Sequence, residues 1–216
     1  MNYFPLTTNE VYERLYQNKS LRRSIQMPWE IDPAHSQATF SVKHMMFSTV
    51  RGQFKVLSGH LHIDEQNPHN SWVDAQVDAA SIDTRDERRD GHLRSPDFFD
   101  VQNYPTLTFK STKVEHTGGN EYNVIGDLTM HGVTRPVTFK AEYLGQGKNP
   151  WGLTVAGLTA KAKVNRKDWN LNWNQALEAG GWLVSDDVTI EIDLETVQKP
   201  EEAQAAAAKE TTTTQQ

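Results

Sequence analysis

Apolar and polar side chains alternate along most of the chain after Trp29, which is the pattern of strands that bury one face. Val73, Ala75 and Val77, for example, alternate with aspartate and glutamine side chains. Comparable runs occur in the segments 38–43, 60–63, 73–79, 107–109, 124–130, 137–141, 158–164 and 188–194. Roughly eight such runs, separated by turn residues and without long helices between them, predict an all-β fold with an antiparallel sheet.

The apolar face of each strand can be buried in two ways, against a second sheet or by closing the sheet on itself. Closure removes the exposed edges that promote aggregation, and eight strands form a barrel wide enough to hold a small ligand. We therefore expect a closed antiparallel barrel.

Two flanking segments depart from the strand pattern. In residues 1–28, Val11 and Leu15 belong to an apolar stripe at helical spacing, which predicts a helical arm. Residues 198–216 are of low complexity and end in TTTTQQ, so they predict a disordered tail that forms no core. The expected organisation is one barrel domain, residues 29–197, between an arm and a tail.

The stretch RRDGHLRSPDFFDV, residues 88–101, interrupts the strands with a dense run of charge. Nearly all residues from Thr84 to Leu93 are charged, which predicts an exposed helical turn over one end of the sheet. Thr84 and Glu87 have the spacing of a capping box at its start.

Composition excludes some classes of function. The net charge is −6 and the basic residues are dispersed, which argues against a nucleic-acid partner. The chain contains no cysteine, so it has neither a disulfide nor a thiolate metal site. No stretch has the roughly 20 apolar residues that span a bilayer, and the first residues do not resemble a secretory signal. We expect a cytoplasmic location.

Two groups of polar residues are candidates for catalysis. His60 and His62 are two apart on a strand and could ligate zinc with a third residue. However, Leu61 takes the buried face, so we expect both histidines to point to solvent and no metal to bind. His92, Ser95 and Asp97 could form a nucleophilic set, but no nucleophile elbow surrounds the serine. We therefore assign no catalytic residues.

The same charged stretch has two other interpretations. Arg88, His92 and Arg94 could bind an anionic head group at the mouth of a cavity, because guanidinium groups match phosphate geometry. The neighbouring aspartates could instead hold these cations in a structural network. The residue types do not decide between the two.

Several segments, in order, resemble the YceI-like family. They are WEIDPAHSQATFSVKHM from residue 29, RRDGHLRSPDFFDVQNYPTLTFKST from residue 88, GDLTMHGVTRPVTF from residue 126 and SDDVTIEIDLE from residue 185. The resemblance covers residues 29–196. Where the family commonly has Phe-Gly, this chain has Trp169-Asn170, so we expect a differently shaped loop there.

The resemblance implies a lipocalin-like barrel that encloses an elongated apolar tunnel. It also implies binding of a polyisoprenoid or an isoprenoid quinone, no catalytic activity, and homodimers or a periplasmic location in some members. The inward-facing residues that match become candidates for the tunnel lining, together with two phenylalanines that descend from the mouth. They are Phe40, Val42, Phe54, Val77, Phe98, Phe99, Leu107, Phe109, Leu128 and Phe139.

We therefore predict a non-enzymatic protein that holds a long apolar ligand for carriage, storage or stress protection. Its expected partners are a hydrophobic small molecule and a second copy of the chain in a homodimer. No cofactor is expected besides the bound lipid. The alternatives are a hydrolase, using His60 and His62 with a metal or His92 without one, and an interaction module whose barrel is filled by side chains.

Overall fold

The computed structural model describes residues 28–178 and 180–198, and within them eleven β-strands form one antiparallel sheet. All but the last residue of the predicted helical arm and all but the first residue of the predicted tail lie outside the described residues. The strands are β1 (Trp29–Ile31), β2 (Gln37–His44), β3 (Ser48–Phe54), β4 (Leu57–His62), β5 (Trp72–Asp78), β6 (Ile82–Asp83), β7 (Thr106–Gly118), β8 (Glu121–Met130), β9 (Val133–Lys148), β10 (Thr154–Asn165) and β11 (Val184–Gln198).

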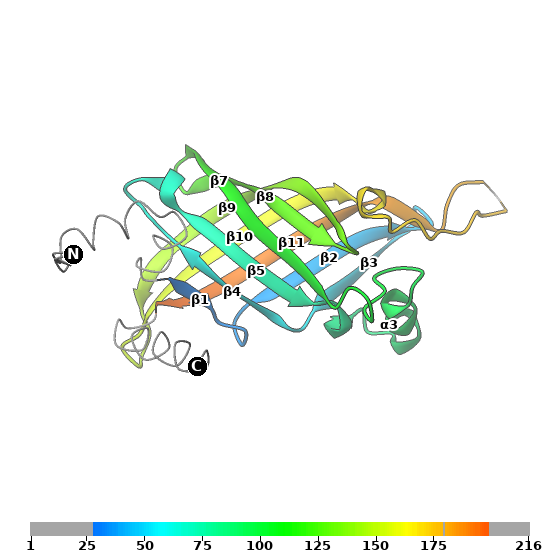
Figure 1. Cartoon of the computed structure of the whole chain (residues 1–216), viewed down its shortest axis with the longest axis horizontal. Helices are drawn as coiled ribbons and strands as arrows, with labels where there is room; N and C mark the ends of the chain where they lie inside the picture. The colour runs from blue at the N-terminus through cyan, green and yellow to red at the C-terminus, as the bar shows by residue number, and fades with distance from the viewer. Residues whose placement is uncertain (1–27, 179, 199–216) are drawn as a thin grey trace, which may run out of the picture.

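Eight of these strands close into a ring in the order β1, β4, β5, β7, β8, β9, β10 and β11 (Figure 1). The ring closes because Trp29 to Ile31 pair with the last residues of β11. β2 continues from β1 alongside the first part of β11, and β3 and β6 follow beyond it. The predicted eight-stranded antiparallel barrel is therefore confirmed.

The barrel has two ends, which we name by the short helices found there (Figure 1). The α3 end carries α3 (Glu87–Arg94) and the 3₁₀ helix η3 (Arg166–Trp169). The η1 end carries the 3₁₀ helix η1 (Pro68–Asn70) and the turn between β7 and β8. One further 3₁₀ turn, η2 (Ala79–Ser81), joins β5 to β6.

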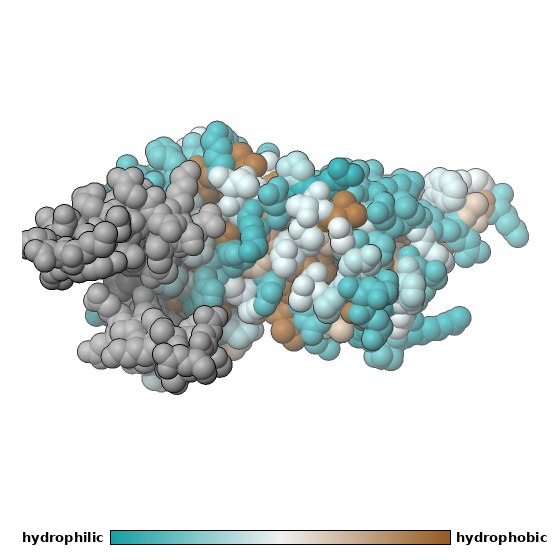
Figure 2. Space-filling model, in the orientation of Figure 1, coloured by the Kyte–Doolittle hydropathy of each residue, from teal (hydrophilic) through white to brown (hydrophobic). Residues whose placement is uncertain are grey.

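Alternating side chains separate an apolar interior from a charged exterior. Exposed lysines pair with acidic residues of neighbouring strands, as in Lys110–Asp74 at 3.1 Å and Lys161–Glu191 at 2.6 Å. Such pairs add little stability but keep the outer face hydrophilic. Figure 2 agrees, since apolar colour on the described part of the viewed face is confined to small separate spots.

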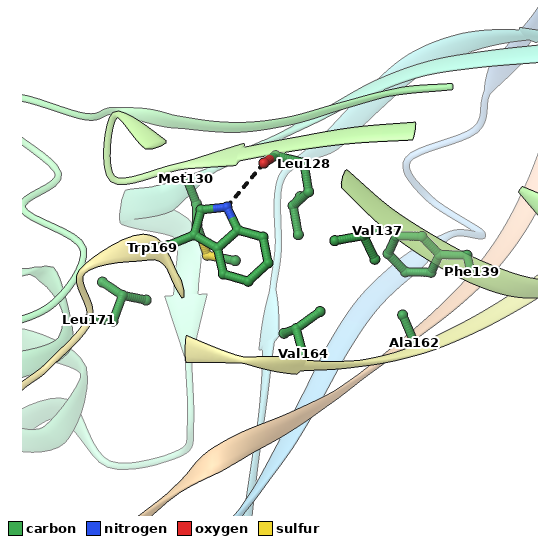
Figure 3. Close-up of a cluster of buried hydrophobic side chains, with 8 residues drawn as sticks. All are labelled: Leu128, Met130, Val137, Phe139, Ala162, Val164, Trp169 and Leu171. Carbon is green, nitrogen blue, oxygen red and sulfur yellow. Dashed lines mark hydrogen bonds between the residues drawn. The ribbon is translucent and has the colours of Figure 1, made fainter. Parts of the chain in front are cut away.

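A buried indole fills the interior at the α3 end. Trp169 is 2% exposed, and its Nε1 donates a hydrogen bond to the Leu128 carbonyl oxygen at 3.0 Å. Figure 3 shows the ring among Leu128, Met130 and Val164, and all four belong to one buried cluster. η3 stops at Asn170, which adopts the left-handed conformation that asparagine tolerates. The Trp169-Asn170 pair therefore forms a helical turn that packs the indole into the barrel.

The predicted helical turn over one end is confirmed as α3, but its predicted cap is wrong. The N-cap is Asp86, whose carboxylate accepts from the Arg89 main-chain N–H at 3.1 Å. Thr84 is instead buried. Its main-chain N–H and its hydroxyl both donate hydrogen bonds to the Asp90 carboxylate. Aspartate is a stronger cap than threonine, and the buried Asp90 binds Thr84 away from the helix end.

Candidate functional site: an apolar cavity through the barrel

A cavity of about 320 Å³ runs inside the barrel and is lined almost entirely by apolar side chains. This volume lies at the lower limit of typical small-molecule sites. Every strand of the closed ring contributes to its wall, for example through Ile31, Leu57, Val73, Leu107, Val124, Phe139, Leu158 and Ile190. Lining residues occur at both ends, from Leu93 at the α3 end to Tyr122 at the η1 end. The cavity is therefore elongated along the barrel.

All ten side chains predicted to line a tunnel lie on this cavity. Among them, Phe54 contacts Phe40 at 5.8 Å and Phe99 at 5.7 Å between ring centroids. Phe109 meets Phe139 edge to face at 5.0 Å. Phe40, Phe54, Phe99 and Phe109 are only half-buried although they face the interior. The barrel is therefore hollow at these rings and is not filled by its own side chains.

Two glycines on the inner face let these rings lie across neighbouring strands. A Cβ at Gly52 would come within 2.5 Å of the Phe40 ring, and a Cβ at Gly126 within 2.6 Å of the Phe109 ring. Any larger residue would displace the phenylalanine that shapes the cavity wall. The alternation pattern includes Gly126 on the inner face, but its steric role depends on pairing with β7.

None of the three cations predicted at the mouth lines the cavity. Two of them are bound to nearby groups of the protein. Arg94 donates to the carbonyl oxygens of Ala80 at 2.9 Å and Ile82 at 2.8 Å. His92 Nε2 lies 2.9 Å from the Asp97 carboxylate, and Arg88 is exposed. This geometry favours the structural network, and a head-group role for the three residues stays a prediction.

The nucleophilic set is not assembled in the form that catalysis needs. The Ser95 hydroxyl donates to the main-chain oxygen of His92 at 2.7 Å, where it caps α3. The His92 ring instead contacts Asp97 and packs edge-on against Phe98 and Trp173. A nucleophile requires a base within hydrogen-bond reach of its oxygen, and His92 does not hold Ser95 in this way.

The two candidate metal ligands on β4 differ from the expectation. His60 is exposed as predicted, but the prediction that His62 points to solvent is wrong. Both ring nitrogens of His62 are buried and have no hydrogen-bond partner in the described part of the chain. Burial lowers the pKa of His62 because it disfavours the charged ring. The parity rule fails here because His62 is the last residue of its strand.

A different group brings three possible ligand atoms together, at the bend between β1 and β2. Asp32, His35 and Glu195 offer atoms within 4.8 Å of one another. His35 Nδ1 lies 2.9 Å from Asp32, and this hydrogen bond raises the pKa of His35 and lowers that of Asp32. A metal competes with the proton for the imidazole, so a raised pKa makes His35 a weaker metal ligand. The hydrogen bond between His35 and Asp32, with Glu195 3.9 Å from His35 Nδ1, accounts for this cluster.

The η1 end carries a polar group that the sequence pattern did not reveal. Glu65 Oε1 accepts hydrogen bonds from the Tyr143 hydroxyl at 2.7 Å and from Gln146 Nε2 at 3.0 Å. Burial, followed by the bond to Glu65, raises the pKa of Tyr143 well above its ordinary value. Glu65 also borders a second hollow of about 450 Å³, which Gln146 and Gln198 help to line.

A closed antiparallel barrel with an elongated apolar cavity defines the protein as a lipocalin-like β-barrel suited to holding a small molecule. Residues 29–196 match the family model for the YceI-like domain, so the chain belongs to the YceI-like family.

Relatives and solved structures agree with this assignment. Protein YceI of Escherichia coli is 42% identical over 137 residues, which cover 63% of this chain and 71% of that protein. The UPF0312 protein of Vibrio parahaemolyticus is 41% identical over 138 residues, 64% of this chain and 73% of that protein. BcnA of Burkholderia cenocepacia superposes with a TM-score of 0.68 at 26% identity, covering 76% of this chain and 98% of that one.

A polyisoprenoid binding domain from Saccharophagus degradans has the same fold. Its TM-score is 0.53 at 16% identity, covering 79% of this chain and 98% of that one. In the described part of the chain, no helix is long and apolar enough to cross a membrane.

Proposed function

We propose that this protein is a non-enzymatic binding protein that holds a polyisoprenoid or isoprenoid quinone in the barrel cavity. The observation that carries the proposal is the hollow apolar interior, with half-buried phenylalanines on its wall. Each methylene transferred from water to such a wall contributes about 0.8 kcal/mol, so affinity accumulates with chain length before ordering costs are deducted. The domain from Saccharophagus degradans, which is described as polyisoprenoid-binding, lends support through its fold.

The two alternatives fit the geometry less well. A ligand-free interaction module predicts a barrel filled by side chains, whereas Phe40 and Phe54 border open space. A hydrolase using His92 requires an activated nucleophile, whereas Ser95 caps a helix. Carriage, storage and stress protection, the homodimer and the cytoplasmic location stay predictions.

The test is to fill the cavity without changing the outer surface. Ala160 lies on the cavity wall, and Lys161 is the next residue of β10, exposed on the outside. Ala160→Phe should abolish loading of geranylgeraniol, measured by native mass spectrometry and by lipid extraction. Lys161→Phe, the matched control, should load like the wild type.

Thermal unfolding of both variants separates a blocked cavity from a misfolded chain, and Ala141→Phe on β9 provides a second blocked variant. If no prenyl lipid can be loaded into or extracted from the wild type, the proposal is wrong. It is also wrong if both blocked variants fold and still bind the lipid.

A further inference from the structure

The Glu65 side chain joins opposite walls of the barrel. Glu65 follows β4, whereas Tyr143 and Gln146 belong to β9. In the closed ring, β4 and β9 are four strands apart in either direction, so they face each other across the interior. The two hydrogen bonds to Glu65 therefore cross the η1 end of the barrel.

Glu65, Tyr143 and Gln146, which we call the polar bridge, lie where the elongated cavity and the second hollow meet. Glu65 and Tyr143 line the elongated cavity, and Glu65 and Gln146 line the second hollow. A ligand chain lying along the apolar wall would bring its end group to these three side chains. In the described part of the chain, Glu65 Oε2 accepts no hydrogen bond, so it can accept one from a ligand.

The charges at this end select the kind of end group. Asp64 and Glu65 carry carboxylates, and the described residues that line the second hollow include no lysine or arginine. The elongated cavity has one described arginine on its wall, Arg166 at the α3 end. Its guanidinium donates to the carbonyl oxygens of Ser185, Leu171 and Trp173 and is thus already occupied. Besides His62, whose pKa is lowered by burial, a diphosphate at the η1 end would meet carboxylates and no basic side chain of the described lining, and like charges in contact repel each other.

We propose that the ligand lies with its head at the η1 end and that the Glu65–Tyr143–Gln146 bridge selects an uncharged head with a hydrogen-bond donor. A prenyl alcohol or a prenylated phenol, such as the reduced form of an isoprenoid quinone, has such a head, whereas an oxidised quinone and a prenyl diphosphate do not. This inference rests on the proposed function, because it concerns the orientation and the head group of the same ligand. It assigns the head to the end of the barrel opposite Arg88, His92 and Arg94.

The orientation can be tested by site-specific alkylation, because the chain has no cysteine of its own. Gln66→Cys places one thiol beside the second hollow at the η1 end, and Asp97→Cys places one at the α3 end. N-geranylgeranyl bromoacetamide, whose amide N–H is a donor, should alkylate the first thiol and not the second, as measured by intact mass. Both thiols should react equally with free bromoacetamide, which controls for accessibility. Selective alkylation at Asp97→Cys would overturn the inference and leave the proposed function intact.

The head-group preference is measured as the ratio of the affinities for geranylgeraniol and geranylgeranyl diphosphate in a competition experiment. The wild type should prefer the alcohol by at least about tenfold, as expected for one hydrogen bond to a charged group. Glu65→Lys should reverse the preference, and Glu65→Gln should reduce it. The control Arg88→Gln, at the α3 end, should leave it unchanged.

The outcomes separate the two proposals. Equal binding of alcohol and diphosphate by the wild type and by Glu65→Lys overturns the head-group assignment alone. A loss of preference in Arg88→Gln, with Glu65→Gln unchanged, places the head at the α3 end and also overturns it. If neither compound binds the wild type, the proposed function fails and this inference fails with it.

Discussion

The two ends of the barrel use polar side chains in opposite ways. At the α3 end, Arg94, Arg166 and Asp90 bind main-chain groups of the segments that close the barrel, and Trp169 fills the space beneath them. At the η1 end, one carboxylate, Glu65, bridges the opening with two hydrogen bonds. Both ends contain a buried apolar cluster, around Trp169 at the α3 end and around Trp29 and Leu61 at the η1 end, so the contrast lies in the polar groups, which are partly buried at the first end and exposed at the second.

This difference has a physical consequence. Buried hydrogen bonds to a charged group stabilise more than exposed ones, and the loss of one partner leaves the other buried without a substitute. The α3 end should therefore carry much of the folding stability, whereas the η1 end can open at lower cost. A ligand chain needs an end that opens at low cost in order to enter the barrel, and the η1 end is of this kind.

The largest expected effect is the loss of the indole at the α3 end. Trp169→Ala should lower the free energy of unfolding by about 3–5 kcal/mol, because it leaves a cavity and removes the bond to the Leu128 carbonyl. Urea titration measures the change. Trp151→Ala, at a tryptophan that is 81% exposed, is the matched control and should change stability by less than about 1 kcal/mol. Equal effects of the two substitutions would contradict a packed α3 end.

The α3 network should give the next largest effect. Asp90→Ala removes the acceptor for two buried donors of Thr84 and should lower the free energy of unfolding by about 2–3 kcal/mol. Asp97→Ala, which removes only the half-exposed pair with His92, should cost less than about 1 kcal/mol. If Asp97→Ala is the more damaging of the two, the pair with His92 is the principal support of this end.

The sequence predicted the interior far better than the ends. Strand parity put eight of the ten candidates on the face that borders the cavity, because each strand of a closed barrel shows one face inward along its whole length. Phe98 and Phe99 lie outside the strands and came from the family resemblance alone. At strand ends the rule no longer holds, and the ring nitrogens of His62 are buried against expectation. The capping box at Thr84 failed for a related reason, since a residue beyond the local pattern, Asp90, binds the threonine.

The polar bridge could not be predicted from local patterns. Glu65 and Tyr143 are 78 residues apart, and they meet only because the ring closes. Counting alternate residues from Tyr143 would also place Gln146 on the outer face. A β-bulge shifts the register between β9 and β10 there, so that Tyr143 pairs with Leu158 and Gln146 with Ala156, both of which face inward.

A smaller effect is expected at the η1 end. Tyr143→Phe keeps the ring and removes one donor to Glu65, so it should lower the free energy of unfolding by about 1 kcal/mol. Tyr104→Phe is the control, because that exposed hydroxyl makes no hydrogen bond to the described residues. A loss from Tyr143→Phe as large as that from Trp169→Ala would show that the η1 end is as rigidly built as the other.

The smallest effect is a dependence on alkaline pH at the same hydroxyl. Burial and the bond to Glu65 raise the pKa of Tyr143, so the folded state keeps this proton at a pH where an unfolded tyrosine, with a pKa of about 10, has lost it. Above that pH the folded state binds more protons than the unfolded state, and stability falls as pH rises. The advantage of the wild type over Tyr143→Phe should thus be constant below about pH 9 and shrink above pH 10. An advantage that stays constant up to pH 11 would mean that Tyr143 is solvated as freely as an unfolded tyrosine, and that the η1 end lies open to water.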